Sequence, residues 1–283
     1  MNIDSLVRPN IRKLKPYSSA RSLYQSGVFF DANENALRSA VELPGYPDLN
    51  RYPDPYSADL RKALANYLGV EQKNVFAGNG SDEVIDLLIR IFVNTDEAVA
   101  VMEPAYGMYR VAADTAGVEV VSCDLDKEFQ IDLGSLWDKL GPKVKIIFLC
   151  SPNNPTGNLM RPESIREICS RFNGVVVVDE AYIEFASAPS LVKEIRAFKN
   201  LIVMRTLSKA WGLAGLRIGY AAADEAIIGY LDKVKPPYNV NRVSAAIAIE
   251  ALRNENVMTL TRKTVLEERE VLEEKLRALN FRV

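Results

Sequence analysis

Two charged side chains lie in apolar stretches, where an unpaired charge is costly to bury. Asp179 ends the run VVVVD, and Lys209 lies within TLSKAWGLAGLRIGY at 206–220. Asp179 therefore either bonds a backbone N–H or faces a cationic ligand atom such as a protonated pyridine nitrogen. Lys209 is either a solvated surface charge or a neutral amine that can form a Schiff base with a carbonyl. The second interpretation of each residue predicts chemistry on a bound cofactor.

Two further groups of residues could bind a phosphate. Arg217 follows Lys209 by eight residues, and the hydroxyls of Thr206 and Ser208 lie just before it. A fork-shaped cation with short donors suits a phosphate. The second group is GNGSDE at 78–83, between a predicted strand and a predicted helix, although the same letters also make an ordinary turn and helix start. Its free N–H groups would be those of Gly80, Ser81 and Asp82.

The motif SPNNPTG at 151–157 follows the apolar run KIIFLC directly. Pro and Asn could simply make a turn here. Alternatively, Asn154 projects from the carboxyl end of one strand, close to where Asp179 ends the next. Ligands of α/β sheets bind at these strand ends, so Asn154 joins the candidate site.

The composition excludes several other kinds of site. The 283 residues include no histidine, which excludes a Ser-His-Asp triad, a Cys-His dyad and any His-ligated metal. The three cysteines form no CxxC pair, so we expect reduced thiols in a cytoplasmic protein and neither a zinc cluster nor a disulfide framework. With 35 Lys+Arg against 37 Asp+Glu, general nucleic-acid binding is disfavoured. No apolar run is long enough for a signal peptide or a membrane span.

Strand and helix patterns alternate along the chain, and near-continuous apolar strands indicate burial on both faces. We therefore predict an α/β fold with a mostly parallel sheet between two layers of helices. The seven predicted strands are Asn74–Ala77, Ala98–Met102, Val118–Ser122, Val144–Cys150, Val175–Asp179, Leu201–Arg205 and Arg217–Ala221. The predicted helices are Asp59–Leu68, Ser81–Phe92, Gly107–Thr115, Pro162–Phe172 and Ser190–Phe198, with a helical pattern from Ser244 onward.

Three motifs together resemble one family. The set SPNNPTG, VDEAY at 178–182 and TLSKAWGLAGLRIGY is similar to the fold-type I aminotransferases that depend on pyridoxal 5′-phosphate. Further motifs, DANEN at 31–35, RYPDP at 51–55, GNGSDE and EPAYGMY at 103–109, resemble the histidinol-phosphate aminotransferases. The resemblance implies a seven-stranded αβα sandwich and an incomplete small α/β domain. It divides the chain into an N-terminal arm at 1–33, a large cofactor-binding domain at 34–243 and the start of a truncated small domain at 244–283.

The resemblance also assigns roles to single residues. Lys209 would bind the cofactor covalently, Asp179 would pair with its ring nitrogen, and Asn154 and Tyr182 would bond its ring hydroxyl. Tyr106 would stack on the ring, while Tyr17 would cover the substrate together with Asn154. The phosphate would be held by Gly80, Ser81, Asp82, Thr206, Ser208 and Arg217, and by Tyr52 of the neighbouring subunit in a homodimer.

The implied reaction transfers an amino group between histidinol phosphate and 2-oxoglutarate, giving glutamate, within histidine biosynthesis in the cytoplasm. No metal, nucleic acid or membrane is implied. Two alternatives stay open. One is another enzyme of the same fold, an aromatic-amino-acid aminotransferase or an amino-acid-phosphate decarboxylase. The other is a module that keeps the cofactor pocket for sensing or dimerisation without catalysis.

Overall fold

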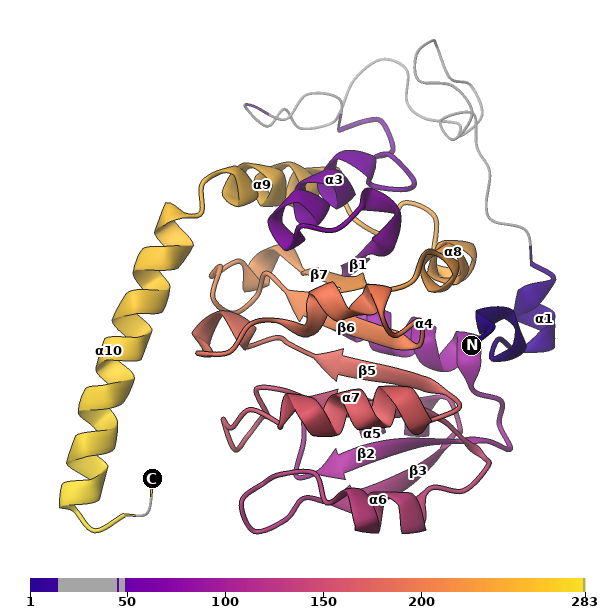
Figure 1. The fold of residues 1–283 in the computed structure, drawn as a ribbon. Coiled ribbons are helices and arrows are strands. Elements are labelled where there is room, and N and C mark those ends of the chain that lie inside the picture. Colours follow the sequence, from indigo (N-terminus) through magenta and orange to yellow (C-terminus); the bar gives the residue numbers. More distant parts are fainter. Residues whose placement is uncertain (15–44, 46–48, 282) are drawn as a thin grey trace.

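Seven strands form one sheet in the order β1-β7-β6-β5-β4-β2-β3 (Figure 1). The computed structural model describes residues 1–14, 45, 49–281 and 283. Strand β7 is antiparallel to both β1 and β6, and the other neighbouring pairs are parallel. The strands are β1 Val75–Asn79, β2 Ala98–Glu103, β3 Glu119–Asp124, β4 Val144–Cys150, β5 Val175–Asp179, β6 Leu201–Thr206 and β7 Ile218–Ala222. The predicted mostly parallel, seven-stranded sheet is confirmed.

Helices cover both faces of the sheet, and each layer has its own apolar core. One layer consists of α3 Ala58–Leu68, α6 Leu133–Lys139, α7 Pro162–Arg171, α9 Arg242–Arg253 and the 3₁₀ helix η4 Leu191–Arg196. The other consists of η1 Ile3–Ser5, α1 Pro9–Arg12, α4 Ser81–Phe92, α5 Met108–Thr115 and α8 Glu225–Val234. Every residue of β5 is buried, as the unbroken run VVVVD predicts for a strand between two helix layers.

The chain changes direction across the sheet between β2 and β4, which are neighbours although β3 lies between them in sequence. Ligands of α/β sheets bind outside the carboxyl ends of strands at such a switch point. The loops after β2 and β4 carry Tyr106 and Asn154, and β5, the next strand, ends at Asp179. The topology alone therefore brings three candidate residues to one edge.

One predicted helix differs in type. Each of the predicted strands, and the other four predicted helices before Ser244, matches the structure within two residues at either end. The segment predicted at Ser190–Phe198 is the 3₁₀ helix η4. Its start is fixed by a buried carboxylate, because Glu180 accepts hydrogen bonds from the Ser190 hydroxyl (2.5 Å) and the Leu191 N–H (2.7 Å). These contacts with Glu180 favour a 3₁₀ helix here although the apolar spacing is that of an α-helix.

The helical pattern after Ser244 corresponds to α9 and to α10 Asn256–Ala278. Helix α10 runs past the carboxyl ends of the parallel strands and contacts the 3₁₀ helix η3 Ile183–Phe185 (Figure 1). The domain boundary expected at residues 243 and 244 falls inside α9, and the boundary at 33 and 34 lies outside the described residues. The division into domains stays a prediction. Among the described helices, none combines the length and apolarity needed to cross a membrane.

Candidate active site

A cavity of about 150 Å³ lies at the carboxyl ends of the strands. The cavity is lined by residues from the start of α4, the loops after β2 and β4, the end of β5, and the segment between β6 and β7. The lining residues are Ser81, Asp82, Tyr106, Cys150, Asn154, Asp179, Ala181, Tyr182, Thr206, Ser208, Lys209, Ala214 and Arg217. Ten of the predicted site residues are in this set, so positions far apart in sequence meet in one cavity.

Asp179 is buried at the floor of this cavity, with 3% of its surface exposed. Its Oδ2 accepts a hydrogen bond from the Tyr109 hydroxyl (2.7 Å), and its Oδ1 accepts one from the Ala181 N–H (3.0 Å). Burial raises the pKa of Asp179 to about 6, and these two donors and the charge of Lys209 oppose the rise. The carboxylate bonds a backbone N–H, as the first interpretation predicts, and it also lines the cavity, where pairing with a cationic ligand atom stays a prediction.

Tyr109 is a site residue that our sequence analysis missed. It is fully buried on α5, and its ring stacks on Phe148 with centroids 4.9 Å apart. Burial and the neighbouring Asp179 charge raise the pKa of its hydroxyl well above the ordinary value. The hydroxyl therefore stays a donor to the carboxylate. The motif EPAYGMY held a signal, because Tyr109 follows Tyr106 by only three residues, across the start of α5, and the two rings are in contact.

Lys209 lines the cavity, but it is not buried as the apolar stretch around it predicted. Its side chain is exposed, and its Nζ lies 5.2 Å from the centroid of the Tyr182 ring. The apolar neighbours explain the difference, because Leu207 and Ala210 turn into the core and leave Lys209 on the open side. The amine is thus accessible to a carbonyl ligand, above a floor that holds Asp179.

The start of α4 and Arg217 form the phosphate-binding candidate. Gly80, the N-cap of α4, has a φ of 83°, and a Cβ there would lie 2.8 Å from the Arg217 guanidinium. Only glycine allows both the left-handed backbone and this close approach. Arg217 itself has a φ of 56°, a strained conformation for a residue with a side chain. The first N–H groups of α4 and the Arg217 cation therefore face the same space.

The Asp82 side chain contacts two other candidate residues, and its phosphate-binding role stays a prediction. Its carboxylate accepts a hydrogen bond from the Tyr106 hydroxyl (3.2 Å) and pairs with Arg217 at 3.6 Å. A carboxylate repels a phosphate, so Asp82 would contribute to phosphate binding through its backbone N–H at the helix start. The Tyr106 ring crosses Tyr109 edge to face at 5.6 Å, which holds it at the wall of the cavity.

Thr206 and Ser208 bond to each other within the turn after β6. The two hydroxyls are 2.9 Å apart, and the Ser208 N–H donates to the Thr206 hydroxyl oxygen (3.1 Å). This turn presents both hydroxyls to the cavity next to Lys209. Backbone packing fixes the opposite wall, because a Cβ on Gly219 of β7 would lie 2.1 Å from the Ser81 nitrogen.

Asn154 and Tyr182 also line a second cleft of about 660 Å³, which opens from the first. Its other wall is α10, which contributes Arg262, Arg269 and Glu270. The Arg262 guanidinium donates a hydrogen bond to the Glu184 carbonyl and so ties α10 to the segment that carries Tyr182. The small cavity and the larger cleft therefore adjoin at two shared polar side chains, Asn154 and Tyr182.

Three predicted residues are not among those that line the cavity, and one of them, Gly80, directly precedes the lining residue Ser81. Tyr17 lies outside the described residues. Tyr52 is 47% exposed and stacks on Tyr238 with centroids 4.5 Å apart. It belongs to a separate surface groove, so it does not reach the cavity of its own chain.

Comparison with known proteins gives the family. The profile described as "Aminotransferase class I and II" matches residues 30–283. The chain belongs to this family. A histidinol-phosphate aminotransferase of Cytophaga hutchinsonii is 43% identical over 98% of this chain and 80% of its own length. The protein of the same name from Parabacteroides distasonis is 46% identical over 96% of this chain and 77% of its own length.

Solved structures agree on the fold of this aminotransferase. The histidinol-phosphate aminotransferase of Clostridium acetobutylicum has a TM-score of 0.73 and 28% identity, over 81% of this chain and 69% of that one. The Sinorhizobium meliloti enzyme, solved in complex with pyridoxal-5′-phosphate, has a TM-score of 0.72 and 28% identity, over 78% of this chain and 61% of that one. These similarities confirm the fold-type I prediction.

The residues of the cavity fit the aminotransferase cofactor, pyridoxal 5′-phosphate. The cofactor has a ring nitrogen that takes a proton, an aldehyde and a phosphate. Asp179, which burial alone would leave poorly stabilised as an anion, matches the protonated nitrogen. An accessible amine at Lys209 matches the aldehyde. The α4 start, the two hydroxyls of the β6 turn and Arg217 match the phosphate.

Proposed function

We propose that this aminotransferase acts on histidinol phosphate, with glutamate and 2-oxoglutarate as the other amino donor and acceptor, in histidine biosynthesis. The observation that carries the choice of substrate is the identity of 41% to 46% with curated histidinol-phosphate aminotransferases over nearly the whole chain. The observation that supports transamination is the cavity that combines Lys209, Asp179 and the phosphate donors.

When bound, pyridoxal 5′-phosphate supplies a ring that withdraws electrons from the substrate carbon that loses its proton. The chain's own residues do the rest. Asp179 would pair with the ring nitrogen and keep it protonated, and Tyr109 and the Ala181 N–H hold both carboxylate oxygens in place. Asn154 and Tyr182 would bond the ring hydroxyl, and Tyr106 would pack on the ring face. Each of these residues binds or orients, and none needs to move a proton.

Lys209 moves the proton. Its Nζ would hold the cofactor and, once the substrate amine takes its place, would move the proton from the substrate α-carbon to the cofactor carbon that carried the aldehyde. The exposed position of Lys209 beside the Tyr182 ring leaves the amine room for both tasks. Gly80, Ser81 and Asp82 with Thr206, Ser208 and Arg217 anchor the phosphate, so the ring stays fixed while the amine moves.

We further propose a homodimer located in the cytoplasm, in which Tyr52 of each chain contacts the cofactor phosphate of its neighbour. Tyr52 is exposed and lies in a groove separate from its own cavity, which is the placement expected of a residue that serves another chain. A two-fold dimer would then share both sites, since each chain gives what it receives. Three free, buried cysteines fit a reducing compartment.

Reduction with borohydride tests the cofactor assignment. Wild-type protein loaded with pyridoxal 5′-phosphate should be yellow, and borohydride should fix the cofactor on the peptide that contains Lys209, which mass spectrometry locates. Lys209→Ala should yield no adduct at this peptide, and Lys233→Ala serves as the matched control with an unchanged adduct. An adduct that forms at the same yield without Lys209 would refute the assignment.

A substrate comparison separates the alternatives. Single-turnover conversion of the bound cofactor to its amine form should be fastest with histidinol phosphate, and 2-oxoglutarate should reverse it. Faster conversion with phenylalanine or tyrosine would favour an aromatic-amino-acid aminotransferase. Release of CO₂ from an amino-acid phosphate would favour a decarboxylase. A sensing module would bind the cofactor and convert it with none of these substrates.

A further inference from the structure

The loop that carries Tyr52 is fastened to the segment that connects α8 to α9. The Lys235 ammonium donates a hydrogen bond to the Pro55 carbonyl (2.6 Å), and the Arg242 guanidinium donates one to the Tyr52 carbonyl (3.0 Å). Between these two bonds, the Tyr238 ring stacks on the Tyr52 ring. Three contacts from one short segment therefore fix the direction of the Tyr52 side chain.

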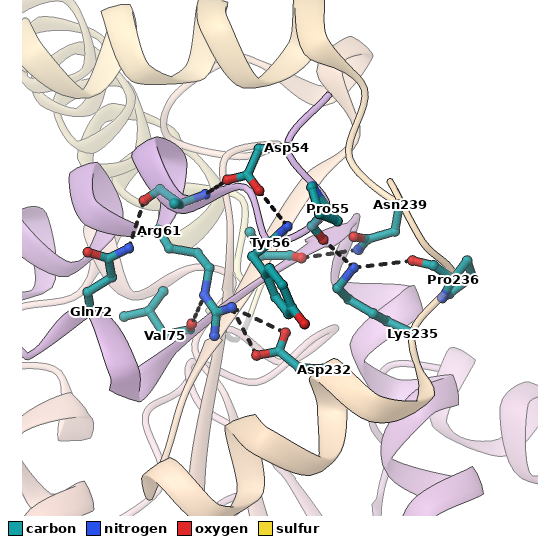
Figure 2. Close-up of polar contacts among 12 residues, drawn as sticks. Asp54, Pro55, Tyr56, Arg61, Gln72, Val75, Asp232, Lys235, Pro236 and Asn239 are labelled. Atoms are coloured by element: carbon teal, nitrogen blue, oxygen red, sulfur yellow. Dashed lines mark hydrogen bonds and ion pairs between the residues drawn. The ribbon is translucent and has the colours of Figure 1, made fainter. Parts of the chain in front are cut away.

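The same segment is fastened to the phosphate-binding turn. The Asn239 amide donates to the Ala77 carbonyl of β1 (3.1 Å) and to Oε2 of Glu83 in the first turn of α4 (2.8 Å). Glu83 in turn accepts the Asn79 N–H (2.5 Å), just before the Gly80 N-cap. Figure 2 shows Lys235 and Asn239 on this segment, with Lys235 bonded to Pro55 on the Tyr52 loop.

Lys235 is an unusual residue for this task. It is buried, with 8% of its surface exposed, and lysine is seldom buried without a carboxylate partner. The carboxylate whose charge acts most strongly on Lys235, that of Asp232, is already paired with Arg61, whose Nη1 lies 3.0 Å from it. The hydrogen bonds of the Lys235 ammonium go instead to two backbone carbonyls, of Pro55 and Pro236 (Figure 2). Burial lowers the pKa of Lys235, so this charge is held at a cost.

We propose that Lys235 is a positioning residue for cofactor binding, which acts through Tyr52 on the phosphate bound by the neighbouring subunit. The inference rests on the proposed function, in which Tyr52 serves the neighbour's site. Lys235 holds the Tyr52 loop through its hydrogen bond to Pro55, and Asn239 bonds the segment that carries Lys235 to β1 and α4. Asp54 shapes the loop by accepting the N–H groups of Tyr56 (3.0 Å) and Ala58 (2.6 Å). Without the ammonium, the loop loses its bond at Pro55, one of the three contacts that position Tyr52, and the Tyr52 side chain is held less firmly.

The test compares two ligands that differ only in the phosphate. Dissociation constants of the ligand-free dimer are measured for pyridoxal 5′-phosphate and for pyridoxal, by absorbance titration. Lys235→Met should weaken binding of pyridoxal 5′-phosphate about tenfold and leave binding of pyridoxal unchanged. Lys233→Met is the matched control, because Lys233 lies two residues before Lys235, at the end of α8, and its Nζ lies over the Tyr230 ring. It should change neither constant.

A double-mutant cycle distinguishes a positioning role from general damage. If Lys235 acts through Tyr52, then Lys235→Met combined with Tyr52→Phe should bind pyridoxal 5′-phosphate no more weakly than Tyr52→Phe alone. Additive losses, or equal losses for pyridoxal, would overturn the inference. If Lys235→Met does not fold, Lys235→Gln, which retains a donor, is compared in the same way.

The two proposals fail differently. Wild-type protein that binds pyridoxal and pyridoxal 5′-phosphate equally would refute the proposed function. A clear phosphate preference that Tyr52→Phe reduces and Lys235→Met leaves intact would refute the role of Lys235 alone.

Discussion

The Tyr109 hydroxyl donates a hydrogen bond of 2.7 Å to Oδ2 of Asp179, and both side chains are buried. The bond joins α5, on one face of the sheet, to the end of β5 at the sheet's edge. A buried carboxylate needs such a donor, because the cost of an unmatched buried charge exceeds that of an ordinary missing hydrogen bond. Tyr109 therefore sets how readily Asp179 carries the negative charge that the cofactor ring requires.

Tyr109→Phe should make Asp179 harder to ionise. The Tyr109 hydrogen bond stabilises the ionised carboxylate and so lowers its pKa. Without this bond, the pKa of Asp179 should rise above its value of about 6. We expect kcat to fall about tenfold, the loss of one hydrogen bond to a charged group. The acidic limb of the pH profile of kcat/KM should move to higher pH. Tyr230→Phe, which removes a hydroxyl bonded to Asp4 far from the cavity, is the control and should leave the profile in place.

The pKa of Asp179 also predicts how the stability of the ligand-free protein changes with pH. The folded-state pKa of about 6 lies above the ordinary value of 3.8, so between these values the folded protein binds more protons than the unfolded chain. Stability from this group is therefore full below about pH 4 and is lost as the pH rises through 6, by up to about 3 kcal/mol.

Asp179→Asn removes this titration and tests the sign. The difference in unfolding free energy, variant minus wild type, should increase from pH 4 to pH 7 and then level off, as measured by urea denaturation of the ligand-free proteins. Glu180, whose pKa burial also raises to about 6, titrates in both proteins and cancels in the difference. If this difference in unfolding free energy does not change between pH 4 and pH 7, burial does not raise the pKa of Asp179 as described above.

A buried ion pair supports the strand that leads to Lys209. Arg205 on β6 and Glu184 on η3 are 2.6 Å apart, with side chains 8% and 5% exposed, and Tyr67 of α3 bonds the same carboxylate (3.2 Å). Arg205→Met would leave Glu184 buried and unpaired, so we expect a loss of about 3–5 kcal/mol in unfolding free energy. Arg166→Met breaks the half-exposed pair with Glu194 and should cost at most about 1 kcal/mol. Similar losses in the two variants would contradict this assignment.

The sequence predicted the sheet well because strand burial is a local pattern. The run VVVVD has no polar face, so its place between two helix layers and the position of Asp179 at its end followed directly. The motif residues converged for the same reason, since parallel strands deliver their carboxyl ends to one edge. The role of Tyr109 could not be predicted this way, because it depends on how α5 packs against β5.

The exposure of single side chains also could not be predicted from the sequence. Lys209 was expected to be buried by its apolar neighbours, yet those neighbours face the core and Lys209 faces the cavity. The apolar positions of α10 show the same limit. The spacing of Val257, Leu260 and Leu272 is helical, as predicted from Ser244 onward, but all three are more than half exposed. Periodicity predicts that a helix has an apolar side, and the packing partner of that side is a separate question.

Subunit mixing tests whether Tyr52 serves the neighbouring site. Lys209→Ala chains lack the catalytic amine, and Tyr52→Phe chains lack the hydroxyl proposed to hold the neighbour's phosphate. In a heterodimer of the two, one site combines Lys209 from the Tyr52→Phe chain with Tyr52 from the Lys209→Ala chain, so that site carries neither defect.

Mixing the two weakly active homodimers should therefore restore activity, up to about half of the wild-type activity per heterodimer because one site of two is complete. If Tyr52 serves its own chain, every site in the mixture keeps a defect, and activity stays at the sum of the two separate proteins. Mass spectrometry of differently tagged chains confirms that subunits exchange, which makes an absence of recovery decisive against the shared site.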